Sequence, residues 1–181
     1  MTLALKRARE RILIEFIIRP EQPKDVAAIT RVNELAFKSQ PHSEQTEHFI
    51  VLALRSAGAL SVSLIAERSN QVIGHIAFSP VQFSDGSTGW YGLGPVAVLP
   101  ELQHQGIGKA LINSGLASLR SSGASGCVVL GDPNYYGRFG FKNRPECIFE
   151  GVPAEYFQSL TFGPLSAVGK VTYHEAFGAK G

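Results

Sequence analysis

The sequence predicts a single domain of the mixed α/β class, in which flanking helices cover a mostly antiparallel central sheet. The chain has 181 residues, close to the length of one typical domain, and 44% apolar against 18% charged residues is an ordinary globular composition. Strand-like and helix-like runs alternate without a linker, repeat or low-complexity segment. We expect residues 1–11 to form a flexible N-terminal arm and residues 12–181 to form the domain.

The first third predicts one strand and two helices. Residues 12–19 are mostly β-branched or apolar and stop at Pro20, which is typical of a strand. Asp25 stands where it can cap a helix over residues 26–37, whose apolar members recur at a spacing of 3.6. A second amphipathic helix is expected over residues 44–57.

The middle of the chain predicts an antiparallel meander. Residues 61–67 and 72–83 are strand-like, and the polar segment 68–71 between them suits a hairpin turn. A third strand-like run covers residues 88–98.

The last third predicts a parallel crossover. Pro100 ends the preceding strand, a helix is expected over about residues 107–122, and a buried strand follows at 127–130. Beyond it we expect a helical or turn piece at 135–139 and a last strand at 171–177.

Charge and composition restrict the partners. The 17 Lys and Arg residues exceed the 15 Asp and Glu residues by only two, which excludes a surface that binds nucleic acid or membranes over its whole area. Four basic residues between positions 6 and 11 are interpreted as a solvated tail, with a local contact to RNA or protein left open. The chain has no apolar stretch of about 18 residues and no secretory signal pattern. We therefore expect a cytoplasmic protein without membrane or nucleic-acid partners, and a homodimer is left open.

The two cysteines, Cys127 and Cys147, form no paired motif and have no histidine cluster beside them. They are interpreted as reduced, partly buried thiols. No metal site is expected.

A glycine loop before the predicted helix at 107–122 suggests a phosphate site. Unpaired N–H groups and a positive dipole gather at a helix N-terminus, and Gly106 and Gly108 let the backbone approach an anion closely. A nucleotide-hydrolase loop would need Gly and Ser or Thr where Gln103 and Ala110 stand. A dinucleotide fingerprint would need a small residue at Leu111. Both classes are disfavoured.

The loop reads Q-x-x-G-x-G, formed by Gln103, Gly106 and Gly108, and a second block reads Y-x-x-x-G-F, with Tyr136 four residues before Gly140. These two blocks, in this order, resemble the GNAT superfamily of N-acetyltransferases. The segment GDPNYYGRFGF, together with the later segment GKVTYHEAF, is similar to the YhbS-like bacterial branch. The resemblance covers roughly residues 16–178 and includes the order of strands and helices.

The resemblance implies that acetyl-CoA is the co-substrate and that it lies in a gap between the fourth and fifth strands. Pro95 supports such a gap because proline cannot donate to a strand ladder. The family binds pantetheine on the fourth strand and pyrophosphate on the amides of the glycine loop, and Asn134 is a candidate side-chain contact. The implied acetyl-CoA contacts are Val96, Ala97, Val98, His104, Gln105, Gly106, Ile107, Gly108, Lys109 and Asn134.

The resemblance further implies direct transfer of the acetyl group to a primary amine of a small molecule, protein or peptide, without a metal. Tyr136 is the candidate catalytic residue, because a phenol is protonated at neutral pH and can donate a proton to the departing thiolate. Tyr135 is interpreted as a packing residue. A general base is unassigned, since residues 90–98 hold no carboxylate or histidine. His75 or Asp132 could serve through a water molecule, but a structural role is favoured for both.

The acceptor amine is not identified by the sequence. In the family, the loop between the first two helices commonly contacts the acceptor, and here it contains His42, Ser43 and Glu44, which either bind the amine or are simply solvated. The alternative function is a non-catalytic acyl-CoA-binding regulatory module.

Overall fold

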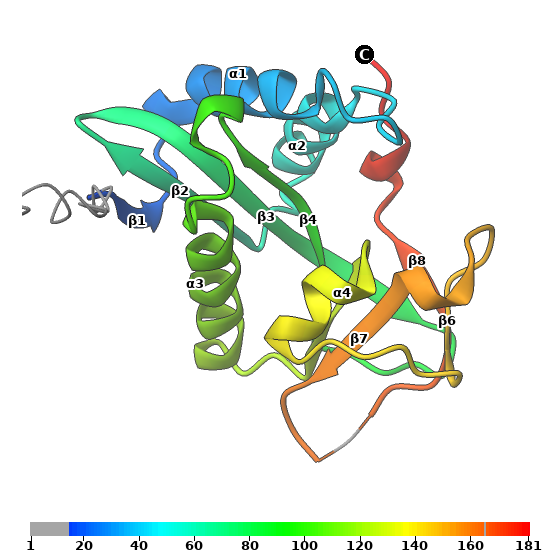
Figure 1. The fold of residues 1–181 in the computed structure, drawn as a ribbon. Helices are drawn as coiled ribbons and strands as arrows, with labels where there is room; N and C mark the ends of the chain where they lie inside the picture. Colours follow the sequence, from blue (N-terminus) through cyan, green and yellow to red (C-terminus); the bar gives the residue numbers. More distant parts are fainter. Residues whose placement is uncertain (1–14, 165) are drawn as a thin grey trace, which may run out of the picture.

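The computed structural model describes residues 15–164 and 166–181, so the predicted arm at 1–11 and the start of the first predicted strand lie outside the described residues. The fold is of the predicted mixed α/β class (Figure 1). One sheet has the strand order β1-β2-β3-β4-β5-β7, while β8 pairs with β3 and with β6. The strands are β1 Ile17–Pro20, β2 Val62–Arg68, β3 Gln71–Phe83, β4 Trp90–Val98, β5 Gly126–Leu130, β6 Cys147–Ile148, β7 Phe157–Thr161 and β8 Gly169–Tyr173.

The helices are α1 Val26–Phe37, α2 Glu47–Ser56, α3 Ile107–Ser121 and α4 Pro133–Tyr136. Short 3₁₀ turns η1 to η5 occupy Pro23–Asp25, Pro100–Leu102, Gly137–Phe139, Ala154–Tyr156 and Glu175–Gly178.

The antiparallel meander is confirmed. Strands β2 and β3 meet in a tight hairpin in which Ser69 and Asn70 both have positive φ angles, 50° and 62°, as a type I′ turn requires. Strand β3 then pairs antiparallel with β4, and its last residues, Val81 to Phe83, pair with β8.

The predicted gap between β4 and β5 is also confirmed. The two strands run parallel and pair from Trp90 with Gly126 to Leu93 with Val129, and the pairing stops there. Strand β4 continues to Val98, still paired with β3 on its other side. Its edge from Gly94 onward therefore faces an opening.

Helices cover both faces of the sheet, with α1 and α2 on one side and α3 on the other (Figure 1). The alternation of side chains along β2 produces this division. Leu64 and Ala66 belong to the core cluster under α3, whereas Ile65 between them packs with Ile29 of α1 and Val51 of α2. The buried residues of α3 recur at helical spacing and are Ile107, Leu111, Ile112, Gly115, Leu116 and Leu119.

Two N-terminal details differ from the expectation. The Asp25 carboxylate does not cap α1; it accepts hydrogen bonds from the Arg19 guanidinium and from the backbone N–H of Gln22. The second helix begins at Glu47 rather than at residue 44.

The C-terminal part departs further. The strand expected at 171–177 ends at Tyr173, because the His174 side chain accepts a hydrogen bond from the Ala176 backbone N–H (3.1 Å) and starts a 3₁₀ turn. Strand β7 was not identified from the sequence. Its residues Gln158 and Ser159 are polar yet 1% exposed, so no apolar run marks this strand.

Cys127 and Cys147 are free and buried, which confirms the sequence-based expectation. None of the helices in the described part of the chain is long and apolar enough to cross a membrane.

Candidate active site

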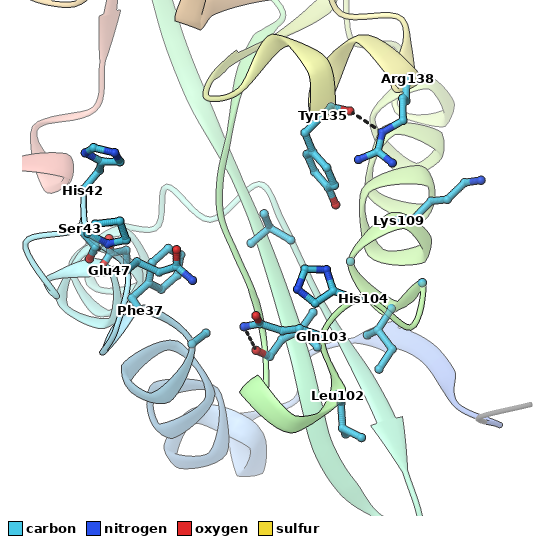
Figure 2. A pocket seen from close by; sticks show the side chains of 18 residues that line it. Phe37, His42, Ser43, Glu47, Leu102, Gln103, His104, Lys109, Tyr135 and Arg138 are labelled. Atoms are coloured by element: carbon cyan, nitrogen blue, oxygen red, sulfur yellow. Dashed lines mark hydrogen bonds between the residues drawn. The ribbon is translucent and has the colours of Figure 1, made fainter. Parts of the chain in front are cut away.

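A cleft of about 830 Å³ lies where the edge of β4 faces the opening. Figure 2 shows its two walls: Phe37, His42, Ser43 and Glu47 come from α1, α2 and the loop between them, and Tyr135 and Arg138 stand opposite. The glycine loop and the first turn of α3 form the rest of that second wall. We call this space the main cleft.

The glycine loop is folded by its own side chains. Gln103 Nε2 donates to the Val98 carbonyl oxygen and Gln105 Nε2 to the Glu101 carbonyl oxygen, both at 3.1 Å. Gly106 has φ 90° in the left-handed region and is the N-cap of α3. These contacts bring the start of α3 to the cleft wall.

The start of α3 has the features of an anion-binding site. The first N–H groups of a helix have no partner within the helix, and the first turn of α3 holds no acidic residue that could neutralise the dipole. Gly106, Gly108 and Lys109 all line the main cleft. A Cβ on Gly108 would lie 3.3 Å from the Tyr135 hydroxyl oxygen, so glycine keeps the passage at this point wide enough for a ligand.

Positive side chains gather at the same end of the main cleft. Lys109 projects from α3, and Arg138 stacks its guanidinium 4.6 Å from the centre of the Tyr135 ring while its Nε donates to the Tyr135 carbonyl oxygen (3.3 Å) (Figure 2). Among the described residues that line the main cleft, the only carboxylate is that of Glu47, on the opposite wall. This end therefore favours polyanionic groups.

The edge of β4 offers main-chain groups to the main cleft. Leu99 N–H donates to the Ile73 carbonyl oxygen of β3 (3.0 Å), and groups along a strand point to alternate sides. The main-chain groups of Val96 and Val98 therefore point away from β3 and into the opening. The main-chain groups of Ala97 point toward β3, with which it pairs. Its side chain is 2% exposed and packs against α1.

The structure brings most of the sequence-predicted contacts together. Ala97 does not line the main cleft, for the reason above. Neither do Gln105 and Asn134, which are both exposed; the Gln105 amide is bound to the loop, and the Asn134 backbone N–H donates to Asp132 Oδ1 (2.8 Å). The predicted contacts that do line the main cleft are Val96, Val98, His104, Gly106, Ile107, Gly108 and Lys109.

A second cavity of about 350 Å³ adjoins the main cleft, and we call it the inner pocket. The two spaces share Phe37, Glu47 and Val96. The inner pocket is mostly apolar, and its other lining residues are Ile50, Leu93, Gly94, Pro95, Leu130, Tyr136, Phe149, Tyr173 and Phe177.

The adjacent tyrosines face different spaces. Tyr136 lines the inner pocket, where burial, with smaller contributions from Tyr135 and Cys127, raises its pKa well above the ordinary value. Gly131 makes room for its ring, because a Cβ there would lie 2.5 Å from Tyr136 Cε2. Tyr135 packs partly against the core, as predicted, but it also lines the main cleft, which the sequence did not indicate.

The two candidate bases, His75 and Asp132, lie outside both spaces. His75 is completely buried; Asn33 Nδ2 lies 3.2 Å from its Nδ1, so its Nε2–H donates to Ser63 Oγ (2.9 Å). Burial lowers the pKa of His75 to about 4, against an ordinary value of 6.5. Asp132 is exposed and caps α4. The structural role favoured for each residue agrees with these positions.

Only part of the loop before α2 lines the main cleft. His42 and Ser43 line the main cleft, whereas the exposed Glu44 pairs with Lys180 Nζ (2.9 Å) and lines neither space. Sequence reasoning missed Glu47, which lines both spaces. Ser43 Oγ donates to Glu47 Oε1 (2.6 Å), and Oε2 is buried without a hydrogen-bond partner among the described residues.

The sequence model of the family described as "Acetyltransferase (GNAT) family" matches residues 29–141, more than half of the chain. The chain belongs to the GNAT family of acetyltransferases. Its relatives include YhbS of Escherichia coli K12, named as an uncharacterized N-acetyltransferase, with 34% identity over 169 residues that cover 90% of this chain and 98% of YhbS.

Solved GNAT structures have the same fold. A GNAT family acetyltransferase from Brucella melitensis, in complex with acetyl-CoA, is 52% identical, with TM-score 0.81 and coverage of 91% of this chain and 99% of that chain. Escherichia coli YhbS in complex with CoA is 32% identical, with TM-score 0.84 and coverage of 93% and 94%. The chain is thus an acetyltransferase with the GNAT fold, as its two sequence blocks predicted.

Proposed function

We propose that this GNAT enzyme transfers the acetyl group of acetyl-CoA to a primary amine by direct attack, with both substrates bound. The main support for this proposal is that the main cleft and the inner pocket adjoin each other. The main cleft has a cationic end at the N-terminus of α3, and the mostly apolar inner pocket is lined by the buried Tyr136. The acetyl-CoA and CoA complexes of the Brucella and Escherichia relatives support the choice of co-substrate.

The main cleft suits the shape and charge of CoA. The N–H groups of Ile107, Gly108 and Lys109 would bind the pyrophosphate, with the charges of Lys109 and Arg138 beside it. The pantetheine arm would lie along the exposed edge of β4 and bond the main-chain groups of Val96 and Val98, as an added strand does. Ala97, Gln105 and Asn134 are not needed in this arrangement.

The thioester would lie at the junction of the two spaces, because Val96 and Glu47 line both and Tyr136 lines the inner pocket. The amine nitrogen attacks the carbonyl carbon, a C–N bond forms, and the C–S bond breaks with its electron pair going to sulfur. Tyr136 donates its phenolic proton to that sulfur. The raised pKa of Tyr136 keeps the proton on the phenol at neutral pH until the thiolate develops.

Direct attack is preferred to an acetyl-cysteine intermediate. Neither Cys127 nor Cys147 lines the main cleft or the inner pocket. Burial also raises the pKa of both thiols, so neither is a ready thiolate nucleophile.

The test is calorimetric titration of the protein with acetyl-CoA, followed by measurement of thiol release with a panel of amines. Binding followed by amine-dependent thiol release is expected. Binding without release by any amine would favour the acyl-CoA-binding module, and absence of binding would refute the assignment of the main cleft.

A further inference from the structure

We propose that the inner pocket selects primary monoamines with a compact apolar or aromatic body, and that Glu47 binds their amino group and takes its proton. The inference rests on the proposed function and deepens it, because it names the acceptor class and the missing base.

Glu47 carries the single carboxylate that lines the two spaces in the described part of the chain. It is the first residue of α2, and Ser43 Oγ holds its Oε1, which fixes the direction of the carboxylate. Its Oε2 is buried and accepts no hydrogen bond from any described residue. A buried carboxylate oxygen without a donor is costly, so an ammonium group at this point would satisfy it.

No cation of the described protein competes for that oxygen. Glu47 takes part in none of the ion pairs between described residues, while its neighbours do: His48 lies 3.7 Å from Glu34, and Glu44 pairs with Lys180. Lys109 and Arg138 stand across the main cleft and do not line the inner pocket (Figure 2). The carboxylate is thus free for a substrate.

The walls of the inner pocket define the body of that substrate. Phe37, Ile50, Phe149 and Phe177 are apolar, and the lining residues with polar side-chain atoms are Glu47, Tyr136 and Tyr173. Aromatic faces favour both apolar rings and an ammonium group. The volume of about 350 Å³ is at the small end of ligand pockets and suits a compact body.

The same walls disfavour two common amine classes. A diamine or polyamine would bury a second ammonium group without a second carboxylate, and an amino acid would bury a carboxylate without a cation. An unpaired buried charge costs several kcal/mol. Amines with one charge and an apolar remainder avoid both costs.

In the proposed reaction the amine nitrogen loses two protons and the CoA sulfur gains one. The ammonium nitrogen gives one proton to Glu47 and becomes the neutral nucleophile. After the C–N bond forms and the C–S bond breaks, Tyr136 protonates the sulfur, and the second proton that leaves the nitrogen restores the Tyr136 phenol. Glu47 releases its proton to solvent, so one turnover yields amide, CoA thiol and one proton.

Two matched pairs of amines test the selectivity on the wild-type protein by thiol release. 2-Phenylethylamine and phenylalanine share a ring and differ by a carboxylate, and hexylamine and 1,6-diaminohexane differ by a second amino group. We expect kcat/KM for the monoamine of each pair to be at least about 100-fold higher, in line with the cost of one unpaired buried charge. A preference for phenylalanine or the diamine, or no thiol release with either monoamine, overturns the inference.

Glu47→Gln tests the base, with Glu44→Gln as the control that removes an exposed carboxylate three residues away. For Glu47→Gln we expect about a 100-fold loss of kcat with 2-phenylethylamine, an unchanged Kd for acetyl-CoA, and partial recovery as the pH approaches the pKa of the free amine, where no base is needed. Glu47→Asp should recover part of the loss at neutral pH. Wild-type kcat in Glu47→Gln overturns the role of Glu47, whereas failure of the wild type to bind acetyl-CoA would overturn the proposed function instead.

Discussion

The two ends of the proposed active site are built in different ways. The proposed phosphate end consists mainly of backbone from one continuous segment, residues 103–109, which contains two glycines and the start of α3. The inner pocket consists of side chains from separate elements, including α1, α2, β4, β8 and the C-terminal 3₁₀ turn. A site made by local backbone can be recognised in a sequence, while a site assembled from distant side chains becomes visible only in the fold.

Their electrostatics differ as well. Lys109, Arg138 and the dipole of α3 make the phosphate end positive, and Glu47 gives the inner pocket its carboxylate. Opposite charges at the two ends would orient a polyanionic co-substrate and a cationic acceptor toward each other at Val96. Affinity for acetyl-CoA and the rate of the chemical step should therefore respond to different substitutions.

The largest effect is expected for Gly108→Asp. A side chain there meets the Tyr135 hydroxyl, and a carboxylate would repel the pyrophosphate, so affinity for acetyl-CoA should fall at least about 1,000-fold in calorimetric titration. Gly163→Asp is the control, because Gly163 is exposed and a Cβ there touches nothing within 4 Å. Equal affinity of Gly108→Asp and wild type would remove the phosphate site from the start of α3.

Tyr135 and Tyr136 test whether acetyl-CoA affinity and the chemical step depend on different residues. Tyr136→Phe should lower kcat by about 100-fold and leave the Kd for acetyl-CoA nearly unchanged, because only the proton donor is lost. Tyr135→Phe should act on acetyl-CoA affinity more than on kcat, since its hydroxyl faces Gly108. Steady-state rates and calorimetry on both variants separate the roles, and the opposite pattern would make Tyr135 the proton donor.

His75 lies outside both ends of the proposed active site and should affect the pH dependence of folding stability. Its folded-state pKa of about 4 lies below the ordinary 6.5, so the unfolded chain binds the extra proton first and stability is lost as the pH falls between these values. From pH 7 to pH 5 the free energy of unfolding should drop by about 2 kcal/mol through this group. Urea unfolding at both pH values measures the drop, and His75→Gln should reduce it; an equal drop in the variant would assign it to other groups.

The smallest effect is expected for Lys109→Ala. Its charge adds to backbone N–H groups that stay in place, so affinity for acetyl-CoA should weaken about 5-fold, less at high salt, with kcat unchanged. Calorimetry at two salt concentrations tests this. A loss of kcat without a change in affinity would mean that Lys109 acts in the chemical step, and it would contradict the separate roles of the two ends.

Much of the fold could be predicted because its signals are local. The meander turn at Ser69 and Asn70, the spacing of apolar residues in α3 and the end of the β4–β5 pairing after Leu93, two residues before Pro95, each have a local sequence signal. Strand β7 could not be predicted, because its buried Gln158 and Ser159 are recognised as interior only through their pairing with β5.

In the candidate site, too, local motifs could be predicted from the sequence, and positions that depend on the fold could not. The motif singled out Tyr136, but the side chain of its neighbour Tyr135 reaches a different space, which depends on how the single turn of α4 sits over the sheet. Glu47 begins a helix on the opposite wall, and nothing in its own segment distinguishes it from Glu44. Only the positions of β4 and Phe37 show which carboxylate faces the cleft.

The most direct test of the two-ended active site is a crystal structure of the protein with CoA. We expect the pyrophosphate within hydrogen-bond distance of the N–H groups of residues 107–109, and the CoA sulfur at the junction of the main cleft and the inner pocket, within reach of the Tyr136 hydroxyl. A sulfur beside the Tyr135 hydroxyl, or a pyrophosphate bound away from the start of α3, would contradict it.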